Sequence, residues 1–490
     1  MVPAPCSQRE SKSVPGTAVY RRRQPERSVV YQVLQGHLET WLVSCREVDE
    51  EGFPVAGYIE QDFRKYLECG ILAHGFARAR CAGCGYTFLI AYSCKGRGIC
   101  PSCNTRRMAE TAAHLVDHVF PQVPVRQWVL SFPKRLRYFL ARDADLLNRV
   151  LRIFLDTVQK ALRSCCLNAP DHARLGAVTF VHRFGSALNG NIHFHCCIID
   201  GLFSAEGEAV QFDEAALTPE VIAGVQAQAR ERILRLFKRR KLLSPEVVDA
   251  MREWGHAGGF SLNADVTVPA WDRSGLERLF RYCARPIFAS ERLQWKEKDQ
   301  QLIYRLPKPR PNGQTLLTLT PLEFLDKLAL LIPPPRKHRH RYHGVLAPNA
   351  PLRQAVTAYA GLSLSDKPVL PDQKPVNTED LTGGPSKLPS SSVYLWAILI
   401  ARIYEILPLL CPQCGGEMAI IAFITEADPI QRVLNHIGEP SKPPLPVHRR
   451  WNGIRILIKR LFRNRDNKLN WYQNLNMIKP SIGNSRGFNF

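Results

Sequence analysis

The chain has no long apolar run near its beginning. The first thirty residues are polar and carry Arg21, Arg22, Arg23 and Arg27, and no hydrophobic segment follows them. A secretory signal or a transmembrane helix requires such a segment. We therefore expect an intracellular protein that is neither secreted nor anchored by a membrane span.

Acidic residues are scarce relative to basic ones. Asp and Glu number 44 against 66 Lys and Arg, which gives a formal net charge of +22. The basic residues gather at 21–27, 238–241, 336–341 and 449–465, a distribution typical of proteins that bind a polyanion. A solvated surface or a membrane-surface patch would also be basic, but the charge is spread widely and no lipidation motif is present. The composition favours a nucleic-acid partner and a cytoplasmic, nucleoid-associated location.

Cysteines, by contrast, are plentiful, and the chain is long. Its 490 residues suffice for two to four domains with a sizeable core. The 15 cysteines would suggest disulfides in a secreted protein. In a reducing compartment, close pairs of cysteines more often bind a metal, so their grouping along the chain decides the interpretation.

Two C-x-x-C pairs, Cys81/Cys84 and Cys100/Cys103, are separated by fifteen residues. Two such pairs at this spacing can supply four thiolates to one tetrahedral Zn²⁺. Four thiolates leave no open position for a substrate, so the predicted zinc is structural.

Further residues accompany this predicted zinc ribbon. Two additional cysteines could replace a ligand or remain free thiols, namely Cys69 and Cys94. Basic residues surround the site and suggest contact with phosphate; they are Lys95, Arg97, Arg106 and Arg107.

Residues 177–201 predict a β-hairpin. Two runs rich in β-branched and aromatic residues flank Asn189-Gly190, a strong hairpin-turn signal. His193 and His195 stand two apart on the second strand and must share one face. If Asn189 and Gly190 form the turn, His182 lies opposite Cys197, on the same face and diagonal to His195. A slip of one residue would move His182 to the other face.

Histidines on one strand face have two interpretations. A single strand histidine is usually a satisfied or exposed residue without a metal. Two or three on one face, in a histidine–hydrophobe–histidine strand, fit the need of a divalent cation for imidazole ligands with open positions for substrate. We treat His193, His195 and His182 as candidate metal ligands.

The order of the remaining elements predicts an α+β fold. A strand-like run begins at Arg126, helical patterns cover 142–162 and 220–243, and another strand begins at Gly259. This order suggests an antiparallel sheet with helices on one face.

A short helix follows the last of these strands. Ser274 as N-cap and Glu277 three residues later form a capping-box pattern, and Pro286 ends the helix. Its apolar stripe is expected to pack inward, with Tyr282 at the edge of that stripe.

Tyr282 has Arg278 four residues before it and Arg285 three residues after it, so both guanidinium groups lie on its side of the helix. A single tyrosine is usually an interfacial residue with a packed ring and a wet hydroxyl. A phenol with a pKa near 10 can nevertheless attack phosphorus with electrostatic help from a metal or an arginine. The neighbouring arginines and the histidine face favour this second interpretation.

Five stretches together resemble the HUH rolling-circle transposases of the insertion-sequence ninety-one family, and within it the common-region (ISCR) relatives. The resemblance covers roughly residues 60–440. The stretches are R-C-A-G-C-G, S-C-K-G-R-G-I-C-P-S-C, H-R-F-G-S-A-L-N-G-N-I-H-F-H, L-E-R-L-F-R-Y-C-A-R-P, and R-Y-H-G-V-L-A-P-N-A at 341–350.

The resemblance implies a mechanism. His193 and His195 would be the pair that binds catalytic Mg²⁺ or Mn²⁺. Tyr282 would become linked to a DNA 5′ phosphate, leaving a free 3′ hydroxyl. His182 stands where the family often has Gln, and its role as a third ligand is our extension. Members with two tyrosines place them four apart, but residue 278 is Arg, so this chain matches a single-tyrosine branch.

The last third of the chain has a Pro-rich and Ser-rich stretch and a further C-x-x-C. Cys411 and Cys414 form half a zinc knuckle, and no second C-x-x-C follows, so closure would need His436, His448 or another chain. The final residues are either a basic helix that grips DNA or an unrelated tail. The predicted parts are a basic arm and small helical segment (1–65), a zinc ribbon (66–112), an HUH nuclease domain (120–350), a linker (363–392), a C-x-x-C module (393–445) and a basic tail (446–490).

Three functions remain open from the sequence. The first is a transposase that nicks and transfers single-stranded DNA at element ends. The second is a DNA-binding remnant that has kept its zinc ribbon but lost its chemistry. The third is an HUH replication initiator. The retained His193, His195 and Tyr282 favour an enzyme, and the zinc ribbon favours the transposase.

Overall fold

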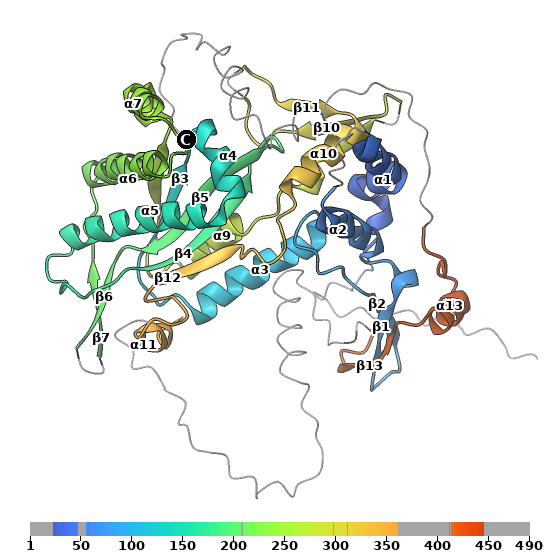
Figure 1. Cartoon of the computed structure of the whole chain (residues 1–490). Helices are drawn as coiled ribbons and strands as arrows, with labels where there is room; N and C mark the ends of the chain where they lie inside the picture. The colour runs from blue at the N-terminus through green and yellow to red at the C-terminus, as the bar shows by residue number, and fades with distance from the viewer. Residues whose placement is uncertain are drawn as a thin grey trace, which may run out of the picture.

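The computed structural model describes residues 23–47, 55–206, 209–296, 298–310, 312–360, 411 and 413–444 (Figure 1). It combines helices with antiparallel sheets, as the sequence predicted. Most of the predicted basic arm, the linker at 363–392 and the tail at 446–490 lie outside the described residues. Among the residues described, no helix is both long and apolar enough to cross a membrane.

The central sheet has five strands, and each pairs with its neighbours in antiparallel fashion. Its middle strand, β5, is rich in β-branched, aromatic and cysteine side chains, which suit a strand that is buried on both faces. In order across the sheet, the strands are β12 (His340–Gly344), β4 (Gly176–Phe184), β5 (Gly190–Ile199), β3 (Val125–Ser131) and β8 (Ser261–Val268).

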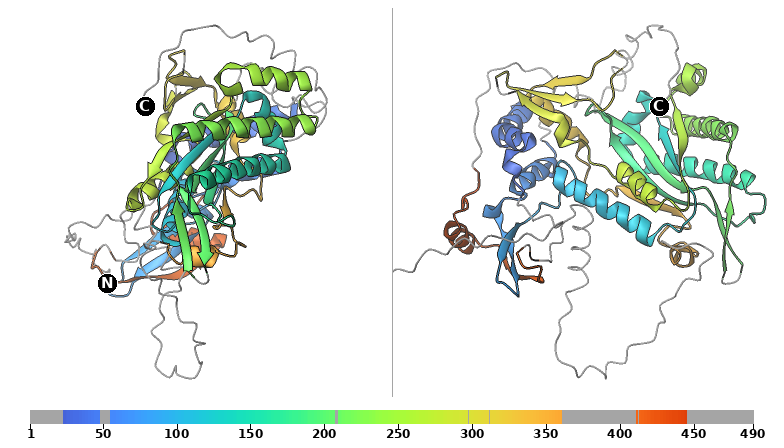
Figure 2. Two further views of the ribbon diagram at one scale, coloured as in Figure 1. Left: turned by 90° about the vertical axis from the view of Figure 1, so that its left-hand side faces the viewer. Right: turned by 180° about the vertical axis from the view of Figure 1, so that it is seen from behind.

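Helices cover both faces of this sheet, which corrects the prediction that they lie on one face only (Figure 2). The physical reason lies in β5, where Phe194 and Ile198 face one core while Cys197 and Ile199 face another. Each apolar face must be covered. One face holds α4 (Lys134–Arg142), α5 (Ala144–Cys165), α6 (Pro219–Arg239) and α7 (Pro245–Glu253), and the other holds α3 (Pro101–His118) and α9 (Arg273–Cys283).

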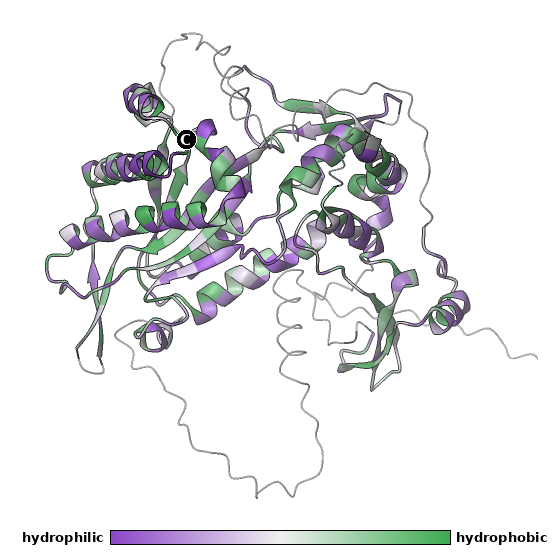
Figure 3. Ribbon diagram, in the orientation of Figure 1, coloured by the Kyte–Doolittle hydropathy of each residue, from purple (hydrophilic) through white to green (hydrophobic). Residues whose placement is uncertain are grey.

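Amphipathic patterning explains how the longer helices are oriented. Hydropathy along the ribbon alternates around α5, so that the helix has an apolar and a polar side (Figure 3). Its apolar residues, including Leu147, Val150 and Phe154, are fully buried in the core under the sheet. Asp143 caps its first turn by accepting a hydrogen bond from the Leu146 amide at 2.9 Å.

A second core lies beside the sheet domain and contains the N-terminal helices. Trp41 of the first helix donates to Asp326 at 2.8 Å, which joins the N-terminal helices to a helix much later in the chain. Thr320 and Glu323 form a capping box at the start of that helix. This part comprises η1 (Pro25–Arg27), α1 (Val29–Glu47), α2 (Gly57–Glu68), η3 (Ser290–Arg292), β9 (Leu293–Lys296), β10 (Gln301–Arg305), β11 (Leu316–Leu319) and α10 (Pro321–Leu331).

A small three-stranded sheet contains strands from the N-terminal and the C-terminal parts of the described chain. Its order is β13-β1-β2, so a strand from the C-terminal segment pairs with one near the beginning (Figure 1). The elements are η2 (Leu72–His74), β1 (Phe76–Cys81), β2 (Thr87–Ala91), β13 (Met418–Ile424) and α13 (Ala427–His436). The remaining elements are β6 (Gly201–Glu206), β7 (Ala209–Glu214), α8 (Gly255–Gly258) and α11 (Arg353–Thr357).

Candidate active site and metal centres

The hairpin of β4 and β5 is present, but its turn differs from the prediction. Residues 185–189 form the loop, closed by a 2.7 Å hydrogen bond from the Gly185 amide to the Asn189 carbonyl, and Gly190 already belongs to β5. Leu188 and Ala187 of this loop are buried in the neighbouring core. Burial of the loop tip therefore outweighs the tendency of Asn189-Gly190 to form a two-residue turn.

The changed turn shifts the register but keeps the histidines together. His182 pairs with His193 rather than Cys197, a shift of four residues from 197 to 193. An even shift leaves every side chain on its predicted face. His182 therefore still shares a face with His193 and His195.

The three histidines form a tight, buried cluster. Their candidate ligand atoms all lie within 4.8 Å of one another. The ring centroids of His182 and His195 are 4.2 Å apart, and those of His193 and His195 are 4.9 Å apart. Their exposed fractions are 4%, 8% and 2% for His182, His193 and His195. Three imidazoles buried this closely need either hydrogen-bond partners or a shared ion.

Hydrogen bonds leave one ring nitrogen of each histidine available to the cluster. His182 donates from Nε2 to the Cys283 carbonyl at 2.6 Å, and His193 donates from Nδ1 to the Asn191 carbonyl at 3.1 Å. The other nitrogen of His182, Nδ1, is buried without a partner, as is Nε2 of His195. Orphaned buried nitrogens that face one another are the donor set that a metal ion requires.

Gln127 of β3 orients His195, and the sequence did not point to it. Its side-chain amide lies 2.9 Å from His195 Nδ1. A glutamine amide can present its oxygen or its nitrogen after rotation, so it accepts the Nδ1 proton when Nε2 serves as a ligand. One sequence signal could have identified Gln127, namely its place in the alternating pattern of β3, the strand that pairs with β5.

The environment keeps all three rings neutral at physiological pH. Burial lowers the pKa of His193 to about 4 and that of His195 to about 3, with neighbouring positive charge adding to the effect on both. Burial likewise lowers the pKa of His182 well below its ordinary value. The neutral imidazole has the free lone pair that coordination needs.

Helix α9 places Tyr282 over this cluster. Its ring centroid lies 5.6 Å from that of His195, and half of the side chain is exposed. The helix begins earlier than predicted, because Asp272 rather than Ser274 is the N-cap and accepts from the Gly275 amide at 2.7 Å. Aspartate is a strong N-cap residue, and Glu277 instead pairs with Arg281 at 2.8 Å.

The two arginines beside Tyr282 have different surroundings. Arg285 lies over the Tyr282 ring, with its guanidinium carbon 4.2 Å from the ring centroid, and its Nη1 atom is buried without a hydrogen bond. Arg278 is 71% exposed and lies 3.6 Å from Asp272. Of these two arginines, Arg285 is therefore the one that lies against the Tyr282 ring.

A cavity of about 620 Å³ adjoins the cluster at His182 and Arg285. His193, His195 and Tyr282 do not line it. Its wall is strongly basic and also aromatic; the lining includes Arg97, Arg107, Arg339, Arg341, Phe180, Phe184 and Tyr342. Burial, together with the charges of Arg97 and Arg107, lowers the pKa of Arg339 to about 10. An anion bound in this cavity would offset the repulsion among these guanidinium groups.

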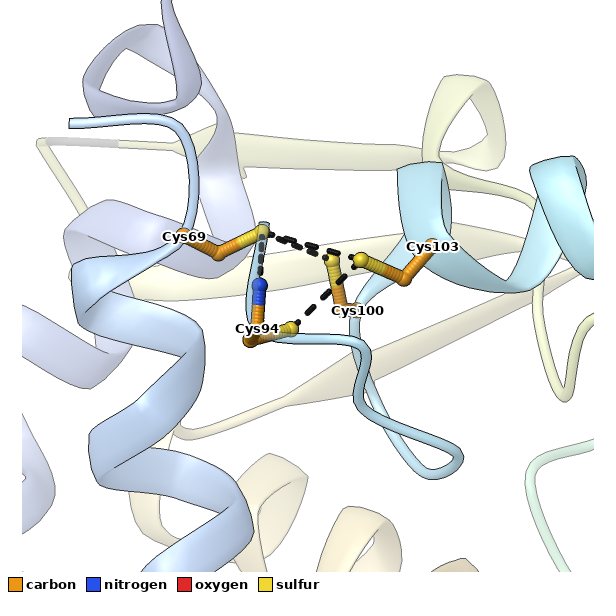
Figure 4. A group of neighbouring side chains, drawn as sticks. All are labelled: Cys69, Cys94, Cys100 and Cys103. Carbon is orange, nitrogen blue, oxygen red and sulfur yellow. Dashed lines mark hydrogen bonds between the residues drawn. The ribbon is translucent and has the colours of Figure 1, made fainter. Parts of the chain in front are cut away.

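The cysteines group differently from the prediction. Cys100 and Cys103 lie with Cys69 and Cys94, and all four sulfur atoms are within 4.8 Å of one another (Figure 4). Cys81 and Cys84 do not join them but lie with Cys411 and Cys414. The assignment of one ion to Cys81, Cys84, Cys100 and Cys103 is thus corrected. Cys69 ends α2 and Cys94 follows β2, so the fold rather than sequence spacing brings them to Cys100 and Cys103.

The four-cysteine group in Figure 4 fits a zinc ion. A tetrahedral ion with Zn–S bonds of about 2.3 Å requires sulfur atoms about 3.8 Å apart. Cys69 lies 3.6 Å from Cys100 and 3.7 Å from Cys103, and Cys94 lies 3.6 Å from Cys103. The centre would hold the start of α3, because Cys100 is its N-cap.

Arg23 provides compensating charge for this centre. It donates to the Cys69 carbonyl at 2.7 Å and to Cys69 Sγ at 3.2 Å. Burial alone would lower the pKa of Arg23, but the negative charge of the neighbouring cysteines raises it above its ordinary value. A zinc bound by four thiolates would carry a net negative charge, which this partly buried guanidinium would offset.

The zinc loop also reaches the cavity. Arg97, between Cys94 and Cys100, donates to the Lys337 carbonyl, and its own carbonyl accepts from Arg339. Asp62 holds the same loop by accepting from the Ile99 amide at 3.1 Å. The cysteine centre therefore fixes part of the basic wall beside the histidines.

Two family models match the chain. The transposase model Y2_Tnp matches residues 176–353, and the transposase zinc-binding domain model Zn_Tnp_IS91 matches residues 42–132. No curated protein and no solved structure gives a significant match. The two models support a transposase of the IS91 type with a structural zinc-binding domain, and they indicate a function in DNA transposition.

Proposed function

We propose that this protein is an HUH transposase that cuts single-stranded DNA at the ends of its element and transfers the strand in a rolling-circle manner. The observation that carries the proposal is the position of Tyr282, on α9, directly beside three buried histidines from the β4–β5 hairpin. A nucleophile next to a set of metal ligands suits cleavage of a phosphodiester.

In the proposed reaction, the Tyr282 hydroxyl oxygen attacks the scissile phosphorus. A bond forms between this oxygen and the 5′ phosphate, the bond from phosphorus to the 3′ oxygen breaks, and the 3′ oxygen takes up a proton as a hydroxyl. The phenolic proton leaves to solvent. Arg285, next to the ring and with a free buried N–H, would hold a phosphate oxygen and stabilise the growing charge.

The proposed ligands of the catalytic metal are Nδ1 of His182 and Nε2 of His193 and His195. A divalent cation bound there would polarise and orient the scissile phosphate. Among the residues described, the cluster contains no carboxylate. Imidazole ligands suit transition-metal ions, whereas Mg²⁺ prefers oxygen. We therefore expect Mn²⁺ to support activity better than Mg²⁺.

The cavity offers a path for the DNA strand. Its arginines would neutralise phosphates, and the half-buried Phe184 and Tyr342 would offer ring faces to bases. Such a combination is typical of proteins that bind single strands without reading a long sequence. Because residue 278 is Arg, we assign the chain to a single-tyrosine, ISCR-like branch.

The proposal is tested with single-stranded oligonucleotides that cover the ends of the DNA element encoding the chain. The strands carry a 3′ label, which stays with the fragment that becomes attached through its 5′ phosphate. With Mn²⁺ we expect a labelled covalent protein–DNA adduct and a fragment with a free 3′ hydroxyl. Binding without an adduct would instead identify the inactive remnant, and adduct formation only on plasmid or phage origins would identify a replication initiator.

The two arginines should differ sharply when each is replaced. Arg285→Ala removes the guanidinium next to Tyr282 and should slow nicking by about 10²-fold, the usual cost of one oriented charge stabiliser. Arg278→Ala should change the rate by less than about fivefold, because exposed ion pairs contribute at most about 1 kcal/mol. Single-turnover nicking rates at saturating DNA measure both. Equal losses in the two variants would contradict this assignment.

A further inference from the structure

We infer that the chain binds a second structural zinc ion, held by Cys81 and Cys84 from the N-terminal region and by Cys411 and Cys414 from the C-terminal segment. This site is independent of the nuclease chemistry. Both family models end before residue 354. Neither therefore includes Cys411 or Cys414.

The sulfur geometry fits such an ion. Cys81 Sγ lies 3.4 Å from Cys414 Sγ, and Cys84 Sγ lies 3.5 Å from Cys411 Sγ. These distances are close to the edge of a zinc tetrahedron, about 3.8 Å for Zn–S bonds of about 2.3 Å. They are far longer than a disulfide bond of about 2.05 Å, and all four cysteines are free.

The two half-sites have the same backbone conformation. The Cys81 amide donates to the Tyr86 carbonyl at 2.8 Å, and the Cys411 amide donates to the Gly416 carbonyl at 2.7 Å, five residues on in each case. The amides of Gly85 and Gly415 donate back to the carbonyls of Cys81 and Cys411 at 3.1 and 2.8 Å.

Each C-x-x-C is followed by a glycine with left-handed φ, +76° at Gly85 and +72° at Gly415. Glycine adopts this conformation without the steric cost that a side chain would add. Two separate segments therefore fold into the same knuckle and face one another through four sulfur atoms. Cys84 and Cys411 are 327 residues apart, so their proximity in the fold does not follow from neighbouring positions in the sequence.

Among the residues described, the core around this segment is small. Four of them are buried and form the cluster at this end of the β13-β1-β2 sheet, namely Ala79, Cys81, Cys411 and Met418. A second small cluster joins α13 to η2 through Leu72, Phe76, Ile430 and Leu434. Where so little apolar surface is buried, a structural metal supplies the folding free energy.

The second ion would attach the C-terminal segment to the N-terminal zinc region. β13 pairs with β1 along its whole length, from Phe76 opposite Ile424 to Cys81 opposite Met418 (Figure 1). The zinc-binding region is therefore a composite of residues 69–103 and 411–444, with one ion at each of its two four-cysteine groups.

Metal content of the full-length protein, purified under reducing conditions, tests the inference. We expect close to two zinc ions per chain, one for each group of four cysteines, and X-ray absorption should show zinc surrounded by sulfur alone. The double variant Cys411→Ser, Cys414→Ser should lose half of the zinc. The control Cys165→Ser, on α5 and outside both groups, should lose none.

Thiol labelling of the unmodified protein tests the same inference without relying on a variant that folds. Cys84 and Cys414 are exposed, so an alkylating reagent should modify them readily unless a metal holds them. We expect both to be protected until a strong chelator is added, while Cys165 reacts at the same rate before and after. One zinc per chain, immediate labelling of Cys84 and Cys414, or a disulfide linking Cys81 to Cys414 would overturn the inference.

Discussion

Tyr282→Phe should abolish the covalent protein–DNA adduct while leaving the affinity for single-stranded DNA nearly unchanged. The substitution removes only the hydroxyl oxygen, so the ring still packs beside His195 and under Arg285. Loss of an attacking nucleophile typically costs at least about 10⁴-fold in rate. Binding should survive because it depends mainly on basic contacts with phosphates.

The matched control for this variant is Tyr138→Phe. Tyr138 lies on α4, on the opposite face of the central sheet from α9, and its replacement should leave adduct formation intact. Peptide mapping of the trapped adduct identifies the attachment site directly. Recovery of DNA on Tyr304, Tyr342 or any residue other than Tyr282 would show that α9 is only a packed helix with an exposed tyrosine.

Arg278→Tyr offers a further test of the single nucleophile. A tyrosine at 278 would stand where families with two tyrosines have the second one, but the Arg278 side chain is exposed and lies near Asp272. We therefore expect the double variant Arg278→Tyr, Tyr282→Phe to form the adduct at least about 10²-fold more slowly than the wild type. The new tyrosine would then not replace the lost nucleophile. Efficient rescue would mean that α9 can use either position.

The shared face of the histidines was predictable because side chains alternate along a strand. A register error of an even number of residues therefore leaves each side chain on the same face. The predicted turn at Asn189-Gly190 was wrong, yet His182 kept its face because the register moved by four residues. The turn itself depended on the burial of Leu188 in a neighbouring core, which local sequence does not reveal. Local periodicity therefore identified the candidate site, and tertiary packing determined its loop.

The cysteine pairing could not be predicted in the same way. A C-x-x-C indicates half of a zinc site but does not specify which other half it meets. Cys69 and Cys94 are single cysteines without a motif, and Cys411 meets Cys84 across 327 residues. Sequence spacing favoured the nearest pair, whereas the actual grouping follows from strand pairing between β1 and β13.

The double variant His193→Ala, His195→Ala should lose metal-stimulated nicking by at least about 10²-fold, since changes even to residues that merely support a ligand cost 10–100-fold. It should retain single-strand binding, because the arginines of the cavity remain. His182→Ala should show a smaller loss, because it removes one proposed ligand and leaves His193 and His195 in place. The exposed His172 provides the control variant His172→Ala, which should nick at the wild-type rate.

Titration with Mn²⁺ and Mg²⁺ at fixed DNA concentration measures these effects. The wild type should reach half-maximal activity at a lower concentration of Mn²⁺ than of Mg²⁺. Undiminished nicking by the double variant in either metal would refute the three-histidine site, even if the adduct on Tyr282 were confirmed.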